Sequence, residues 1–268
     1  MFTDTINQCA ANAARIARLN KSHPFSFWLA SAMAGAYVGL GIILIFTLGN
    51  QLDPSVRPLV MGATFGIALT LVIIAGSELF TGHTMFLTFG VKTGALSHGQ
   101  MWRILPQTWM GNLIGSVFVA LLYCWGGGSL LAADNSLIHS AALAKTTQPA
   151  MTLFFKGALC NWLVCLAIWM AVRSEGAAKF IAIWWCLLAF IASGYEHSVA
   201  NMTLFALSWF GNHSESYTLA AIGHNLLWVT LGNTLSGVVF MGLGYWYATP
   251  RAERPQKKSA SMSERIAN

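Results

Sequence analysis

Charged residues are scarce in this sequence, and their scarcity excludes most soluble proteins. Only 9% of the 268 residues are Asp, Glu, Lys or Arg, whereas soluble globular chains carry about a quarter. Hydrophobic residues make up 56% of the chain, and the mean hydropathy is +0.58. Because so few polar groups could not cover a water-exposed surface, lipid is the expected solvent. The length allows one all-α membrane domain of roughly six spans.

Other features are also missing. The five cysteines are an odd number without the spacing of metal ligands, so neither a disulfide framework nor a metal site is expected. The net charge of +6 comes from basic residues beside apolar runs, not from a basic stripe with interleaved aromatics, which argues against nucleic acid as a partner. A cleavable signal is not expected, because the first apolar run is too long for a signal core.

Apolar runs divide the chain into an N-terminal segment (residues 1–24), a membrane domain (25–248) and a polar tail (249–268) that we expect to be disordered and cytoplasmic. A long mixed loop is expected from Gly126 to Pro149. The six expected spans run over about 25–48, 59–89, 106–125, 152–172, 180–210 and 220–247.

The distribution of basic residues predicts the orientation of these spans. Of the fifteen Lys and Arg, only Arg57 and Lys145 fall in loops opposite the termini, and Lys156 lies within a span. Since basic residues gather on the cytoplasmic side, both termini are expected there. An even number of spans, such as six, satisfies this arrangement in a multi-pass protein of the bacterial inner membrane.

The second and fifth spans are each interrupted by glycine and polar residues. The interruptions lie around Gly76–Thr84 and Gly194–Asn201, and both contain the pattern Gly-x-Glu. Three spans in each half place the halves in opposite orientation, which is typical of an inverted 3+3 repeat with a pathway where broken helices meet. Irregular backbone at this depth must line a cavity or be buried by protein; simple packing kinks are the alternative.

Three residues near these interruptions are candidates for the pathway. His197 follows the second interruption, where it can exchange a proton near neutral pH, although a buried, hydrogen-bonded histidine is the alternative. Thr81 lies in the first interruption and can face His197 across a pore. Lys156 lies near the outer end of the fourth span, where it either attracts anions or extends its amine to the membrane surface.

Five further polar residues are predicted to support the two interruptions. Glu78 and Glu196 are expected to accept hydrogen bonds from backbone amides freed at the helix ends. Asn161, Asn201 and Asn233 are expected to form hydrogen bonds between helices.

Four motifs together resemble the formate/nitrite transporter family over residues 7–247. They are GSELFTG (76–82), KGALCNWLVCLA (156–167), SGYEHSVANM (193–202) and GNTLSG (232–237). The resemblance implies an aquaporin-like fold, a homopentamer with one pore per protomer, and transport of a small monovalent anion without enzymatic chemistry or a cofactor. Overall likeness favours nitrite, while formate or another weak-acid anion stays an alternative. An aquaporin-like pore for neutral solutes and a haem or quinone oxidoreductase subunit are weaker alternatives.

The resemblance also implies roles for individual residues. His197 and Thr81 match the polar centre of the pore, with proton exchange at the histidine, and Lys156 matches an electropositive residue of the outer vestibule. His83 departs from the formate channel pattern, and its role stays open. The remaining matches are Phe65 and Phe190 at an outer constriction and Leu69, Leu79 and Phe80 at an inner one.

Overall fold

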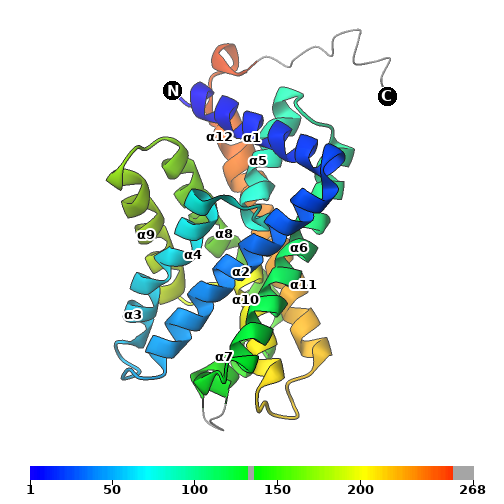
Figure 1. Cartoon of the computed structure of the whole chain (residues 1–268). Helices are drawn as coiled ribbons and strands as arrows, with labels where there is room; N and C mark the ends of the chain where they lie inside the picture. Colours follow the sequence, from blue (N-terminus) through cyan, green and yellow to red (C-terminus); the bar gives the residue numbers. More distant parts are fainter. Residues whose placement is uncertain (132–135, 256–268) are drawn as a thin grey trace.

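The computed structural model describes residues 1–131 and 136–255, and these residues form helices and connecting loops without any strand (Figure 1). The α-helices are α1 (Thr3–Ser22), α2 (Pro24–Gly49), α3 (Arg57–Thr64), α4 (Gly66–Thr70), α5 (Phe80–Thr93), α6 (His98–Trp125), α7 (Leu137–Thr146), α8 (Ala150–Val172), α9 (Ala177–Ala192), α10 (Ser198–Phe210), α11 (Leu219–Leu235) and α12 (Gly244–Ala248). The π-helices are η1 (Leu71–Gly76) and η3 (Ser236–Leu243), and the 3-10 helices are η2 (Ser129–Leu131) and η4 (Arg251–Glu253).

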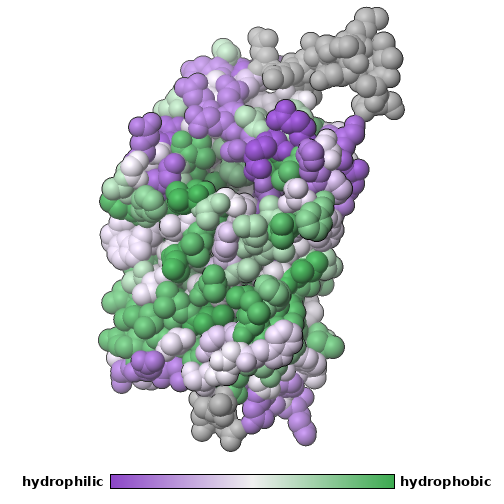
Figure 2. All heavy atoms as spheres, viewed as in Figure 1, coloured by the Kyte–Doolittle hydropathy of each residue, from purple (hydrophilic) through white to green (hydrophobic). Residues whose placement is uncertain are grey.

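Several of these helices can cross a membrane. Five helical stretches are long and apolar enough, and α9 and α10 are shorter apolar helices. Figure 2 shows a hydrophobic belt between two more hydrophilic ends. Large side chains such as Leu29, Phe118 and Trp185 are more than half exposed on this surface, which suits contact with lipid tails. The chain is therefore a multi-pass membrane protein. The five long stretches are Pro24–Gly49, Arg57–Gly76, His98–Trp125, Ala150–Val172 and Leu219–Ala248.

Glycines let the long helices cross closely. At the crossing of α2 with α6, a Cβ added at Gly115 would overlap the carbonyl oxygen of Ala32. At the crossing of α8 with α11, a Cβ added at Gly232 would overlap the carbonyl oxygen of Phe154. Small residues at such positions bring backbones into direct contact, which drives helix association in lipid.

Local sequence signals account for where several helices begin and end. Ser97 and Gln100 form a reciprocal capping box that starts α6, and Pro24 occupies the first turn of α2. Gly94, with φ of 76°, ends α5, as expected where a helix terminates in the left-handed conformation.

The two interruptions are visible as non-helical segments. Residues 77–79 separate η1 from α5, and residues 193–197 separate α9 from α10. Each segment follows or includes a glycine with positive φ, 84° at Gly76 and 67° at Gly194. Only glycine adopts this conformation without steric cost, so Gly-x-Glu marks the point where the chain leaves the helix.

Two segments outside the long helices pack against opposite ends of the bundle (Figure 1). Helix α1 lies across one end and buries Ile6, Cys9 and Ile16. Helix α7 lies at the other end and buries Ile138; it occupies the stretch predicted as a mixed loop. The tail was expected to be disordered over 249–268. Within it, Arg251–Glu253 form η4, and residues 256–268 lie outside the described part.

Candidate functional site

His197 and Thr81 meet at the centre of the molecule. The His197 ring is the N-cap of α10, where its Nδ1 accepts a hydrogen bond from the Ala200 amide at 3.1 Å. Its Nε2 lies 3.1 Å from Thr81 Oγ1. Because a backbone amide only donates, the neutral ring carries its proton on Nε2 and donates it to Thr81. The Thr81 hydroxyl thus keeps its own proton for another acceptor.

Thr81 is fully buried, and of this pair only His197 lines the adjacent narrow throat. The throat is a void of about 10 Å³ lined by His197 and by apolar side chains, at the lower limit for one water molecule. Phe65 and Phe190 pack edge to face here, with ring centroids 5.5 Å apart. Leu69 and Leu79 line the same void. Phe80 is buried but lines neither the throat nor the cavities beside it, so it stands apart from the other predicted constriction residues.

A cavity lies on each side of the throat. The α7-side cavity, about 150 Å³, is lined by His197, Phe190 and Lys145 among others. The α1-side cavity, about 360 Å³, is lined by Leu79, Arg15 and residues of η1, α8 and α9. His197 and Phe190 border both the throat and the α7-side cavity, and Leu79 borders both the throat and the α1-side cavity. The three spaces therefore follow one another through the molecule.

Asn112 of α6 supports the first interruption. Its Oδ1 accepts from the Phe80 amide at 2.9 Å, and its Nδ2 donates to the carbonyls of Glu78 at 2.9 Å and Ser31 at 2.7 Å. The Glu78 amide donates to the Ala30 carbonyl at 3.1 Å. These bonds satisfy backbone groups that the interruption removes from helical pairing. Sequence reasoning missed Asn112, although it lies within an apolar span as Asn161 does, so the same signal could have found it.

Asn233 of α11 supports the second interruption in the same way. Its Oδ1 accepts from the Ser198 amide at 2.9 Å. Its Nδ2 donates to the carbonyls of Glu196 at 3.1 Å and Gly157 at 2.8 Å. The Glu196 amide donates to the Lys156 carbonyl at 3.3 Å. Each atom of this set has a counterpart in the set around Asn112.

Asn161 connects the two sides of the throat. Its Nδ2 donates to the Asn233 carbonyl at 2.6 Å and lies 3.2 Å from Thr84 Oγ1 and 3.4 Å from the Thr81 carbonyl. This side chain of α8 therefore joins the support of the second interruption to the start of α5.

The carboxylate of Glu196 is paired with a lysine. Lys145 Nζ lies 2.7 Å from Glu196 Oε1, and Asn201 donates to Oε2 at 2.6 Å. Asn201 also donates to Asn225 Oδ1 at 2.9 Å. Glu196 and Asn201 thus contact each other. In the described part of the chain the Glu196 carboxylate pairs with these side chains and not with the backbone amides expected from the sequence, and it balances the charge of Lys145, whose amine lines the α7-side cavity.

Lys156 points elsewhere. Its amine donates to the Gln148 side chain at 2.9 Å, and it does not line the α7-side cavity, which Lys145 does. The sequence places Lys145 in a loop, whereas the chain folds there into α7, which brings the amine to Glu196. The sequence alone could not reveal the contact between Lys145 and Glu196, because it depends on how α7 packs against the bundle.

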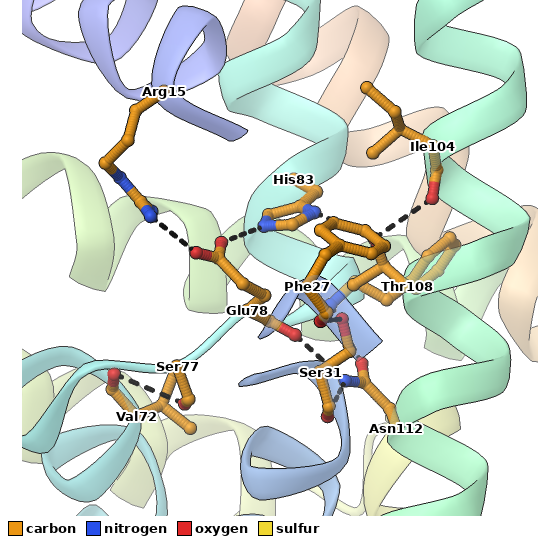
Figure 3. Close-up of polar contacts among 11 residues, drawn as sticks. Arg15, Phe27, Ser31, Val72, Ser77, Glu78, His83, Ile104, Thr108 and Asn112 are labelled. Carbon is orange, nitrogen blue, oxygen red and sulfur yellow. Dashed lines mark hydrogen bonds and ion pairs between the residues drawn. The ribbon is translucent and has the colours of Figure 1, made fainter. Parts of the chain in front are cut away.

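Glu78 carries a different pair of partners (Figure 3). Arg15 Nη1 of α1 lies 2.7 Å from Glu78 Oε1. His83 Nε2 lies 2.7 Å from Oε2, and His83 Nδ1 lies 3.0 Å from Thr108 Oγ1. Glu78 and His83 are almost completely buried and both line the α1-side cavity. His83, whose role the sequence left open, thus contacts Glu78 and Thr108.

Metal-ligating side chains do not gather in the described part of the chain. No three His, Cys, Asp or Glu residues among residues 1–131 and 136–255 lie close enough to hold an ion.

Comparison with known proteins agrees with this architecture over almost the whole chain. A sequence model described as formate/nitrite transporter matches residues 3–247. The nitrite transporter NirC of Escherichia coli (strain K12) is 84% identical, with both chains covered completely.

Solved structures show the same likeness. One described as an FNT family ion channel is 86% identical with a TM-score of 0.92, covering 92% of this chain and 99% of that one. A pentameric formate channel with formate bound is 25% identical with a TM-score of 0.71, covering 84% and 96%. The full-length family match and the high identity lead to one conclusion: the chain belongs to the formate/nitrite transporter family.

Proposed function

We propose that this protein carries nitrite, a small monovalent anion, across the bacterial inner membrane without altering it chemically. The observation that carries the proposal is the throat between two cavities, where the one polar side chain among the described lining residues is that of His197, which contacts Thr81 at 3.1 Å. The 84% identity to a nitrite transporter supports nitrite as the anion.

The pathway is proposed to run between two inverted halves. The matched supports around Asn112 and Asn233 favour this reading, because each Nδ2 and Oδ1 binds equivalent backbone groups of the two interruptions. Positive φ at Gly76 and Gly194 supports it as well. Counting each interrupted stretch as one span yields six, with both termini on the cytoplasmic side as the basic residues predict. A pentamer is proposed from the solved relative described as pentameric.

The throat controls passage by desolvation. An anion loses most of its hydration between Phe65, Phe190, Leu69 and Leu79, which is costly unless donors replace the lost water. The Nε2–H of His197 is such a donor, because His197 lines the throat, and Thr81 Oγ1 lies 3.1 Å from this nitrogen. Proton exchange at His197, as expected from the sequence, requires opening the Ala200 amide contact to Nδ1. We propose that His197 acts first as a hydrogen-bond donor through Nε2.

Lys145 is proposed to offer N–H donors to the anion in the outer part of the pathway. Its amine lines the α7-side cavity, and the carboxylate of Glu196 holds it in place at 2.7 Å and balances its charge. The role predicted for Lys156 passes to Lys145 in this proposal, since Lys156 is directed to Gln148.

Flux in proteoliposomes tests the proposal. Nitrite uptake into vesicles with wild-type protein should be much faster than uptake into protein-free vesicles at pH 6 and pH 8. His197→Asn should reduce that flux at both pH values, because the Nε2–H at the throat is lost. His224→Asn is the matched control. His224 contacts the Gln148 carbonyl at the edge of the bundle. Undiminished flux with the wild-type pH profile in His197→Asn would remove His197 from the mechanism.

Formate is the second candidate, because a solved relative of the same fold is described with formate bound. Competition separates the two anions. If nitrite is the preferred substrate, excess formate should inhibit nitrite uptake weakly. Strong inhibition at equal concentration would assign the pore to small carboxylates as well.

A further inference from the structure

The α1-side cavity contains a charged cluster that the transport proposal does not use. It consists of Glu78 with Arg15 on one carboxylate oxygen and His83 on the other, both at 2.7 Å (Figure 3). His83 and Glu78 are 2% and 4% exposed, and all three residues line the cavity. The remaining charged residue lining this cavity is Lys179, on α9.

The surroundings of His83 accommodate two protonation states equally well. Nε2 donates to Glu78 in both states. In the neutral ring, Nδ1 is an acceptor, and the Thr108 hydroxyl can donate to it across 3.0 Å. In the protonated ring, Nδ1 donates to Thr108 instead, and the hydroxyl turns to the Ile104 carbonyl, which is also 3.0 Å away. Both ring nitrogens stay hydrogen-bonded either way.

His197 differs in this respect. Its Nδ1 faces the Ala200 amide, which cannot reverse its direction of donation. A second proton on His197 would place two donors against each other and break the cap of α10. Of these two histidines, His83 is therefore the one whose surroundings are built to gain and lose a proton.

Protonation of His83 changes the charge of the cavity wall. With a neutral ring, Arg15 and Glu78 cancel, so the cluster has no net charge. With a protonated ring, the cluster carries one positive charge. A unit charge beside a partly dry cavity strengthens the binding of a small anion.

The second interruption lacks this variable charge. Asn201 lies seven residues after Gly194, as His83 lies seven residues after Gly76, and it donates to Glu196 Oε2. Lys145 occupies the place of Arg15 on Oε1. Because an amide does not titrate, that cluster stays neutral over the range in which a histidine changes charge.

We propose that His83 is a proton-dependent anion-binding residue of the α1-side cavity, whose positively charged form strengthens the binding of small anions there. This inference rests on the proposed function, since nitrite is the anion considered. It adds a pH dependence on the α1 side that does not involve the throat.

His83→Asn tests the proposal, because it copies the neutral cluster of the second interruption and preserves a donor to Glu78. Nitrite is applied from the α1 side of oriented proteoliposomes between pH 5.5 and 8.5. The apparent affinity of the wild type should fall roughly tenfold as the ring loses its charge, the effect of about one unit charge near the cavity. His83→Asn should show a flat profile at the weak, high-pH value. His98→Asn, at the exposed start of α6, should retain the wild-type profile.

A second measurement does not depend on transport or on the variant's folding. In wild-type protein with ¹⁵N-labelled histidine, the His83 ring should carry two protons at low pH and one, on Nε2, at high pH. A ring that keeps one state from pH 5.5 to 8.5 would overturn the proposal, as would a His83→Asn profile that follows the wild type. Absence of nitrite flux in the wild type would instead contradict the proposed function. The ring protonation of His83 would then decide this inference by itself.

Discussion

At the residue scale, buried asparagines hold the interruptions open. Asn161, Asn201 and Asn233 were identifiable from the sequence because polar residues within apolar spans need partners. Asn112 makes contacts equivalent to those of Asn233 and also lies within an apolar span, so the same signal could have identified it. Lys145 was hidden, since its approach to Glu196 depends on tertiary structure. The sequence therefore indicated which type of residue supports the interruptions, but it did not identify all of those residues.

Removing one of these asparagines should destabilise the protein. Asn233→Ala leaves two carbonyls and one amide of the second interruption without their partner, at an expected cost of about 2–4 kcal/mol. The measurement is the thermal unfolding midpoint in detergent. Asn7→Ala, at an exposed position of α1, should leave the midpoint unchanged, and an equal midpoint for Asn233→Ala would show that the support is dispensable.

Cys9 offers a residue-scale probe of α1. Burial against the bundle raises the pKa of its thiol to about 12, so the thiol stays protonated at any pH well below that value. Since the thiolate is the reactive form, Cys9 should react slowly with maleimide at pH 8 in the folded protein and rapidly after denaturation. Equally fast reaction in both states would mean that α1 does not pack as described.

At the element scale, the structure departs from the sequence-based expectation mainly outside the spans. The apolar runs predicted the long helices well, because span length is dictated by membrane thickness. Helix α7 escaped prediction, because its surroundings of glycine and mixed polarity are typical of a loop. It buries Ile138 and carries Lys145 to the α7-side cavity, so the element missed is also one that completes the candidate site.

Helix crossings make a direct prediction at this scale. Gly232→Ala would drive a methyl group into the Phe154 carbonyl and separate α8 from α11, so folded protein should fall sharply in yield. Gly223→Ala lies in the same helix with open space around it and should be neutral or stabilise by up to about 1 kcal/mol. Size-exclusion chromatography of the two variants side by side measures the difference, and similar yields would contradict the close crossing.

At the scale of the whole molecule, two cavities reach a common throat from opposite ends. The sequence predicted the throat pair His197 and Thr81, which lie 3.1 Å apart, through the position of each residue beside an interruption. It did not predict the pairing of a glutamate with a cation at each end, which depends on Arg15 and Lys145 arriving from α1 and α7. Residues within the spans were thus more predictable than residues brought in by the flanking helices.

Assembly is testable at the same scale. We expect a homopentamer, by likeness to the solved relative described as pentameric. Native mass spectrometry should give the mass of five 29.0-kDa chains. A monomer as the sole species under mild detergent conditions would contradict that expectation.

The most direct test of the account is the reversal potential of the wild-type protein in a planar bilayer under a nitrite gradient. If nitrite passes the throat between the two cavities as the anion, current should flow and its reversal potential should follow the nitrite equilibrium potential. Current that follows the cation gradient, or no nitrite-dependent current from folded protein that is present in the bilayer, would contradict the account.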